Sequence, residues 1–250
     1  MESTHLTSGA LLAVDIGATN IKYCLVDADG TLLEDPRRRP TPYPCTPERL
    51  VGVVADRIIK AKVERAGVGF PGEFTDGRVV RPGNLSRPGG VSTPVDPELD
   101  AHWRGFELQR ALREATGADV RMVNDASLAA LGASQGVGRE VVITLGTGCG
   151  LALVVDGELV RVRDVGAAAF DDGRTFDQAL GERARAEDEA RWHRDLVKAV
   201  AGFTDEFAAT AIHLAGGNAR RVTPDVFADL AVPVEIDGNF APLRGAARLF

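Results

Sequence analysis

Residues 11–22 have the sequence Leu-Leu-Ala-Val-Asp-Ile-Gly-Ala-Thr-Asn-Ile-Lys, and this stretch decides the expected fold. An apolar run ends at the small residues Gly17 and Ala18, and a second apolar run follows over residues 21–26. Two such runs separated by a glycine turn are typical of a β-hairpin. The chain is therefore predicted to open with a hairpin that has a tight turn.

A similar turn returns at residues 144–150, Thr-Leu-Gly-Thr-Gly-Cys-Gly, between apolar runs at 141–145 and 151–155. Glycine lets the backbone approach a ligand and turn its N–H groups outward, and threonine adds a hydroxyl, so each turn suits phosphate oxygens. One glycine-rich hairpin equally fits an ordinary turn. The recurrence favours two clamps on one polyphosphate.

An acidic residue, Asp15, precedes the first turn. A carboxylate beside bound phosphates is repulsive unless a cation lies between them, and Mg²⁺ is the natural cation. The sequence therefore predicts that Asp15 acts through Mg²⁺.

Composition favours a globular protein of the reducing cytoplasm. Of the 250 residues, 44% are hydrophobic and 26% charged, and the net charge of −7 gives no electrostatic footprint for nucleic acid or an anionic membrane. The N-terminal residues lack the features of a signal peptide, and no apolar run reaches membrane length. Three widely spaced cysteines indicate neither a zinc site nor a disulfide framework. The basic run Arg37-Arg38-Arg39, flanked by prolines, is interpreted as a solvated loop.

Strands and helices alternate along the chain. Beyond the two hairpins the pattern predicts strands at 31–33, 66–70, 120–123 and 211–214, and helices at 48–62, 106–116, 126–131, 182–207 and 242–250. The segment 75–97 is expected to be an irregular loop that shapes a site. His213 lies inside an apolar strand and is interpreted as a satisfied core histidine.

The order of five motifs resembles the ROK family of sugar kinases, with polyphosphate glucokinases the most similar in appearance. The motifs are Asp-Ile-Gly-Ala-Thr-Asn-Ile-Lys, Gly-Phe-Pro-Gly at 69–72, Asn-Asp-Ala at 124–126, Leu-Gly-Thr-Gly-Cys-Gly at 145–150 and Leu-Ala-Gly-Gly-Asn at 214–218. The resemblance implies an α/β fold: a two-lobed, actin-like (ribonuclease-H-like) ATPase with duplicated mixed β-sheet domains and a cleft between them. The expected lobes are residues 1–123, with a C-terminal helix at 239–250 packing back on them, and residues 124–238.

The resemblance also implies site residues. Asp125 matches the catalytic base that takes the proton of the attacking hydroxyl, although an aspartate before an alanine-rich helix equally fits an N-cap. Gly72, Asn84, Asn124 and Asp164 match the acceptor site, and Asn84 alone would be a turn residue. The expected phosphate or nucleotide ligands are Asp15 (holding Mg²⁺ through water), Gly17, Thr19, Asn20, Lys22, Gly146, Thr147, Gly148, Gly216 and Gly217. Gly216 and Gly217 equally fit a packing turn that contacts no ligand.

The acceptor side departs from the family pattern. The usual Glu-x-Gly-His is Asp-Val-Gly-Ala at 164–167, the asparagine after Asn-Asp-Ala is Ser127, and a helix glutamate is Ala133. A site that binds particular hydroxyls discriminates through those hydrogen bonds, so recognition should be altered. This pattern favours a polyol other than glucose as the acceptor.

Three functions are weighed. The first is a kinase that transfers phosphate from ATP or polyphosphate to a sugar, amino sugar or cyclitol hydroxyl. The second is a silent sugar or nucleotide sensor, and the third an assembly ATPase. Retention of Asp125 favours the kinase, because a sensor needs no base. The acidic balance shows no basic track for polyphosphate, which favours a nucleotide donor. The expected partners are a small-molecule polyol and a second copy in a homodimer, with no nucleic acid or membrane.

Overall fold

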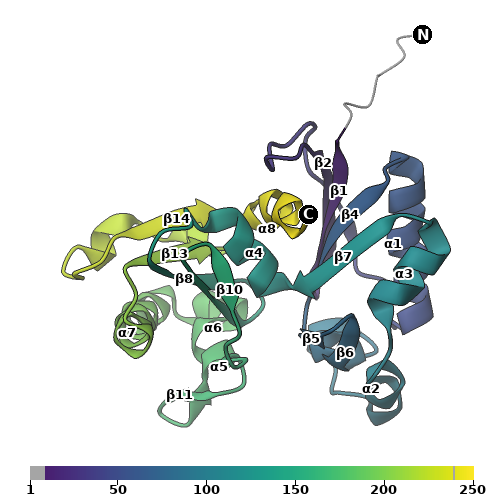
Figure 1. Ribbon diagram of the computed structural model, residues 1–250. Coiled ribbons are helices and arrows are strands. Elements are labelled where there is room, and N and C mark those ends of the chain that lie inside the picture. The colour runs from purple at the N-terminus through teal and green to yellow at the C-terminus, as the bar shows by residue number, and fades with distance from the viewer. Residues whose placement is uncertain (1–8, 239) are drawn as a thin grey trace. The chain divides into compact units, whose positions relative to one another are not determined.

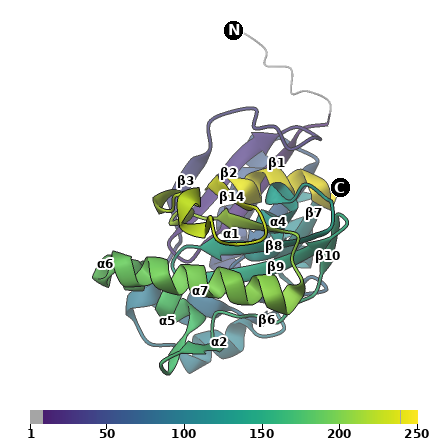
Figure 2. The same ribbon diagram turned by 90° about the vertical axis from the view of Figure 1, so that its left-hand side faces the viewer.

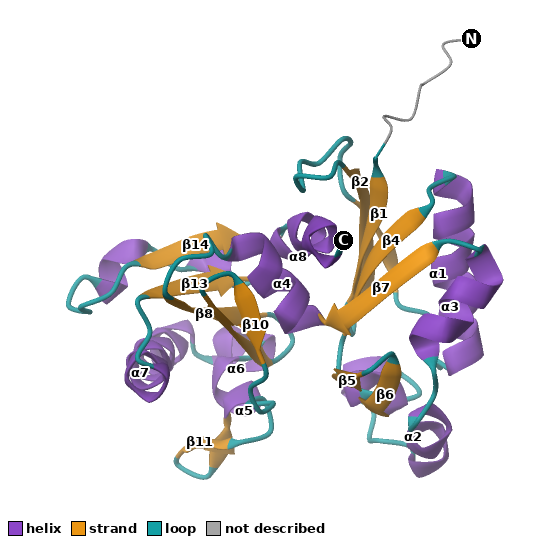
Figure 3. Cartoon of the chain, in the orientation of Figure 1, coloured by secondary structure: helices purple, strands orange, loops and turns teal. Residues whose placement is uncertain are grey.

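The computed structural model describes residues 9–238 and 240–250, and the chain divides into two compact units (Figures 1 and 3). The first unit comprises residues up to 128 together with 242–250, and the second comprises residues 129–241. Residues 1–8 and Asn239, which the predicted lobes include, lie outside the described residues. The lobe limits expected from the sequence stay a prediction.

The first unit contains a mixed sheet of five strands in the order β3-β2-β1-β4-β7. Strands β1, β2 and β3 are antiparallel neighbours, and β1, β4 and β7 run parallel. All six residues of β1 are buried, as expected for a central strand with both faces covered. The bounds are β1 (Leu11–Ile16), β2 (Asn20–Val26), β3 (Arg37–Pro40), β4 (Arg65–Phe70) and β7 (Asp119–Asn124), with a small hairpin of β5 (Glu73–Thr75) and β6 (Arg78–Arg81).

Helices cover both faces of this sheet (Figure 1). On one face lie α1 (Pro47–Ala61) and α3 (Leu108–Thr116), and α2 (Pro97–Trp103) packs beside them. Helix α1 begins where Thr46 caps it and Pro47 occupies the first turn, and it buries Leu50, Val54 and Ile58. On the other face lies α8 (Ala241–Gly245), followed by a 3₁₀ turn over 246–249. The strand β4 has glycine at position 67 because an added Cβ would lie 2.7 Å from Ala246 Cβ.

The second unit repeats the same plan with the strand order β10-β9-β8-β13-β14. Strands β8, β9 and β10 are antiparallel neighbours, and β8, β13 and β14 run parallel. The predicted α/β fold with duplicated mixed sheets is therefore confirmed. The bounds are β8 (Arg139–Leu145), β9 (Cys149–Val155), β10 (Glu158–Val160), β13 (Ala211–Ala215) and β14 (Val234–Gly238), with a small hairpin of β11 (Ala169–Asp171) and β12 (Arg174–Thr175).

The long helix α7 (Glu189–Phe207) packs along one face of the second sheet (Figure 2). Its buried stripe includes Trp192, Leu196, Val200 and Phe203, the residues whose helical spacing the sequence shows. Two short helices, α5 (Phe176–Leu180) and α6 (Glu182–Glu187), precede it, and α4 (Asp125–Ala133) contains the boundary between the units. Within the described residues, no helix is long and apolar enough to cross a membrane.

The other face of the second sheet holds a buried charged group. The imidazole of His213 is fully buried, with Nε2 2.9 Å from Glu140 Oε2 and Nδ1 3.0 Å from Asp237 Oδ2. Burial would lower the pKa of His213, but the two carboxylates outweigh it and hold this pKa above its ordinary value. His213 is the satisfied core histidine that the sequence predicts, and its charged form donates both N–H groups.

Three expectations about secondary structure are wrong. Residues 37–39 form strand β3 rather than a loop, because pairing with β2 satisfies the backbone whatever the side chains. The segment 31–33 contributes one bridge, Val26 with Leu32, and no strand. The helix expected over 182–207 breaks at Asp188, whose carboxylate caps α7 by accepting from Arg191 N at 2.9 Å. In addition, the expected loop 75–97 contains β6 and two 3₁₀ turns.

Candidate active site

The carbonyl oxygens of the first glycine turn, residues 17–20, accept hydrogen bonds from the segment that follows β3. The three donors are Thr41 Oγ1 to Gly17 O at 2.7 Å, Tyr43 Oη to Ala18 O at 2.6 Å, and Thr41 N to Thr19 O at 3.0 Å. Within the described part of the chain, no acceptor takes the amides of Ala18 and Thr19. Successive backbone N–H groups in a turn can form a concavity that binds anions.

The second turn, residues 146–148, is held in the same way. Gly146 O accepts from Glu182 N at 2.9 Å and from Asn218 Nδ2 at 3.1 Å, and Leu145 O accepts from Asn218 N at 3.0 Å. Gly148 O accepts from Gly146 N at 3.0 Å. Among residues 9–238 and 240–250, the amides of Thr147 and Gly148 have no acceptor, and the Thr147 side chain is exposed. Each unit therefore presents a threonine and two successive amides.

The glycines of the turns have different reasons to be glycine. An added Cβ on Gly146 or Gly217 would meet no atom within 4 Å, so these two positions have space beside them. An added Cβ on Gly148 would clash with the carboxylate of Asp177, whose Cγ would lie 2.8 Å away. Gly216 has a φ of +95° and packs on the backbone of Leu145. Packing thus explains Gly148 and Gly216, whereas no such contact accounts for glycine at positions 146 and 217.

Asp15 lies at the carboxyl end of β1, directly opposite Lys22 on β2. Its side chain is nearly buried, and its Oδ2 lies 3.2 Å from Lys22 Nζ. Open α/β sheets bind ligands at the carboxyl ends of their parallel strands. Mg²⁺ is commonly held by one or two carboxylates together with substrate phosphates and water. Asp15 therefore lies where such a carboxylate would be expected, and its charge is paired with that of Lys22.

Asp125 lies at the same end of the first sheet, where β7 passes into α4. In register, Asp15 is paired with Gly69 on β4, and Gly69 is paired with Val123 on β7. An added Cβ on Gly69 would lie 3.3 Å from Asp125 Cα, so the glycine lets the start of α4 approach the sheet. The Oδ1 of Asp125 accepts from Ala126 N at 2.8 Å. Asp15 and Asp125, two of the predicted acidic site residues, thus lie at the same end of the first sheet.

Asn124, rather than Asp125, performs most of the capping of α4. Its Oδ1 accepts from Ala126 N at 2.9 Å and from Ser127 N at 3.3 Å. Its Nδ2 donates to Gly72 O at 2.8 Å, which ties the Pro-Gly turn after β4 to the start of the helix. The 3₁₀ turn that contains Asn84 packs on the same segment, since an added Cβ on Gly83 would contact Pro71 and Gly72. The structure thus brings together three of the predicted acceptor residues, Gly72, Asn84 and Asn124.

The fourth predicted acceptor residue, Asp164, belongs to the second unit. It is exposed, and its Oδ1 accepts from Gly166 N at 3.0 Å. Asp177 N donates to Gly166 O at 2.9 Å, and Asp177 Oδ1 accepts from Cys149 N at 2.8 Å. Burial raises the pKa of Asp177, and the charge of Asp164 adds to the increase. Asp177 therefore links the Asp164 segment to the second glycine turn.

Sequence reasoning missed four residues that hold the turns: Thr41, Tyr43, Asp177 and Asn218. Burial raises the pKa of Tyr43 to about 12, which keeps its hydroxyl a donor. Asn218 follows Gly216 and Gly217 directly, so its position after a glycine pair was the available signal. The other three lie more than twenty residues from the turns that they hold, and no local pattern indicates the contact.

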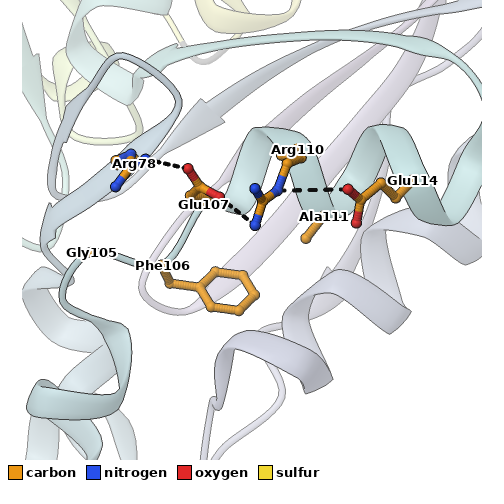
Figure 4. A pocket seen from close by; sticks show the side chains of 7 residues that line it. All are labelled: Arg78, Gly105, Phe106, Glu107, Arg110, Ala111 and Glu114. Carbon is orange, nitrogen blue, oxygen red and sulfur yellow. Dashed lines mark ion pairs between the residues drawn. The ribbon is translucent and has the colours of Figure 1, made fainter.

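A hollow of about 630 Å³ on the first unit is a different feature (Figure 4). Its charged side chains are engaged with one another: Arg78 and Arg110 pair with Glu107, and Arg110 lies 3.6 Å from Glu114. None of the predicted site residues lines it. It is therefore not the candidate active site.

Comparison with known proteins identifies the class. Residues 11–168 match the ROK family, and the chain belongs to it. A glucokinase of Streptomyces coelicolor is 31% identical over 181 residues, covering 69% of this chain and 52% of the relative. A polyphosphate glucokinase of Mycobacterium leprae is 29% identical over 189 residues, covering 72% and 53%. The chain thus spans about half the length of these curated relatives.

A solved structure extends the likeness to nearly the whole chain. The inorganic polyphosphate/ATP-glucomannokinase of Arthrobacter sp. strain KM superposes with a TM-score of 0.78 at 29% identity, covering 96% of this chain and 97% of that one. The family resemblance of the sequence motifs is thereby confirmed.

Proposed function

We propose that this protein is a kinase that transfers the terminal phosphoryl group of ATP or polyphosphate to a hydroxyl of a sugar or sugar-like polyol. The observation that carries the proposal is the pair of turns, 17–20 and 146–148, whose carbonyls are bound internally while successive amides are left for an anion. Membership of the ROK family and the names of its kinase relatives support the same reaction.

Asp125 is the proposed general base. It accepts the proton of the acceptor hydroxyl while that oxygen forms a bond to the terminal phosphorus and the bond to the leaving phosphate breaks. Asn124 fixes the start of α4, and so positions Asp125, through its bonds to Ala126, Ser127 and Gly72. Mg²⁺, when bound near Asp15, would neutralise phosphate charge. The ten predicted donor residues, from Asp15 to Gly217, retain their proposed roles.

The acceptor is proposed to be a polyol other than glucose. Asp164 is a shortened carboxylate on an exposed segment, and Ala167 provides no hydrogen-bonding side chain. A site that loses a hydrogen-bonding partner loses discrimination for the matching hydroxyl. Gly72, Asn84 and Asn124 are the proposed remaining contacts.

A screen of donors against acceptors with the purified protein tests the function. ATP and polyphosphate are each offered with neutral sugars, amino sugars and cyclitols, and the phosphorylated product is detected by mass spectrometry. We expect transfer to at least one polyol, with glucose a poor acceptor. Tight binding of a polyol without transfer from either donor would instead favour a silent sensor.

A further inference from the structure

Strand β3 places a second basic residue beside the predicted donor site. Arg38 lies directly opposite Lys22, and Lys22 lies directly opposite Asp15. Directly opposed residues of antiparallel strands share one face of the sheet, with neighbouring strands about 4.8 Å apart. The three side chains therefore form one row, from nearly buried Asp15 through Lys22 to exposed Arg38.

Arg37 and Arg38, the first two of the three arginines on β3, differ in their partners. Arg37, on the opposite face, lies 3.3 Å from Glu34 Oε2. Within residues 9–238 and 240–250, Arg38 makes no ion pair or side-chain hydrogen bond. Lys22 is paired with Asp15 at 3.2 Å, so Arg38 provides the net positive charge of the row, which a bound anion would neutralise.

The row also lies close to the first glycine turn. Asn20 and Pro40 are paired at the turn end of β2 and β3, and Lys22 and Arg38 are paired two residues further along, at a rise of about 7 Å. An anion bound to the turn amides could therefore continue past Lys22 to Arg38 only if it carries charge along its length. A linear polyphosphate has this property, whereas the charge of ATP ends at three phosphates.

We infer that Lys22 and Arg38 form a binding subsite for the distal phosphates of a linear polyphosphate, with Arg38 as the residue that selects this donor over ATP. The inference rests on the proposed kinase function and names its donor. It revises the expectation from overall charge, because a local basic row exists on an acidic protein. An edge strand also uses basic side chains to prevent edge-to-edge pairing, and the test separates the two roles.

The experiment compares Arg38→Gln with the matched control Arg37→Gln on the opposite face of the same strand. The readout is kcat/KM for a long-chain polyphosphate divided by kcat/KM for ATP, measured with the best acceptor of the screen. We expect this ratio to fall about tenfold in Arg38→Gln, the loss of one charge-assisted hydrogen bond, and to stay unchanged in Arg37→Gln. The salt dependence of polyphosphate affinity should also weaken in Arg38→Gln alone.

An equal effect of the two variants, or an equal effect on both donors, would overturn the subsite. Transfer from ATP by a protein that does not bind polyphosphate would overturn it while leaving the kinase function in place. If neither donor supports transfer, the kinase function fails, and calorimetry with polyphosphate then decides the subsite alone: binding lost in Arg38→Gln but retained in Arg37→Gln supports it, and any other pattern overturns it.

Discussion

Gly146→Val and Gly148→Ala separate a ligand-binding role from a packing role within one turn. At position 146 an added Cβ would meet no atom within 4 Å, so valine should change the free energy of unfolding by less than about 0.5 kcal/mol. Its methyl groups would occupy the space through which phosphate oxygens reach the amides of Thr147 and Gly148. Two charge-assisted hydrogen bonds of about 1.5–3 kcal/mol each would be lost, which weakens donor affinity by roughly 100-fold or more.

At position 148 the added Cβ would clash with the carboxylate of Asp177, which must then leave Cys149 N. Overpacking of this kind costs about 1–3 kcal/mol, and each kcal/mol lowers the melting temperature of a chain this size by about 2–4 °C. The melting temperature of Gly148→Ala should therefore lie several degrees below that of the parent, whereas that of Gly146→Val should equal it.

Calorimetry measures donor affinity, using polyphosphate and a non-hydrolysable ATP analogue with Mg²⁺, and thermal unfolding measures stability. Acceptor affinity serves as the control, because it should not change in Gly146→Val. Unchanged donor affinity in a folded Gly146→Val protein would refute the assignment of this turn to phosphate. A loss of stability equal to that of Gly148→Ala would refute the reading of open space beside Gly146.

The remaining predictions concern the base, the clamp on the first turn and the buried histidine. Asp125→Asn should lower kcat by about 10²- to 10⁴-fold with donor affinity nearly unchanged, and Asp119→Asn at the other end of β7 is the control; full activity would exclude Asp125 as the base. Tyr43→Phe removes the donor to Ala18 O and should raise KM for the donor several-fold with little change in kcat, and a change in kcat alone would contradict this positioning role. Because the pKa of His213 is raised on folding, its charged form stabilises the protein below pH of about 6.5, and this stability is lost as the pH rises through the higher folded value. Urea unfolding across pH 6–9 should show that decline in the parent and lose it in His213→Leu, and a flat parent profile would contradict it.

The sequence predicts the two glycine hairpins, the parallel strands β4, β7 and β13 and the buried stripe of helix α7, because apolar residues recur in them with the period of each structure. It does not predict the parallel strand β14. It does not predict β3, whose Arg-Arg-Arg-Pro has no apolar alternation and is a strand only because β2 pairs with it. It also misses the break at Asp188, where one carboxylate converts a continuous helical pattern into two helices.

The candidate site, like the fold, is predicted from the sequence only in part. Glycine and threonine in the two turns are visible in the sequence, as is Asp125 after a strand. The hydrogen bonds from Thr41 and Tyr43 and to Asp177 are not visible, since each depends on contacts between segments far apart in the chain. For Asn218 the position after a glycine pair is the only signal. The basic row of Lys22 and Arg38 likewise depends on the register of β3, which composition cannot reveal.

The duplicated plan allows the two units to be compared position by position. Asp15 and Thr144 both stand two residues before the first glycine of a turn, and each is paired with the next parallel strand, at Gly69 and at Ala215. The first unit thus places a carboxylate where the second places a hydroxyl, and the residue paired across the hairpin is Lys22 in the first unit and Gly150 in the second. Phosphate chemistry needs charge at the reacting atoms, whereas holding phosphate oxygens needs only amides and hydroxyls. We therefore expect Asp15 and Lys22 of the first unit to govern the rate of phosphoryl transfer. The uncharged turn of the second unit should govern donor affinity.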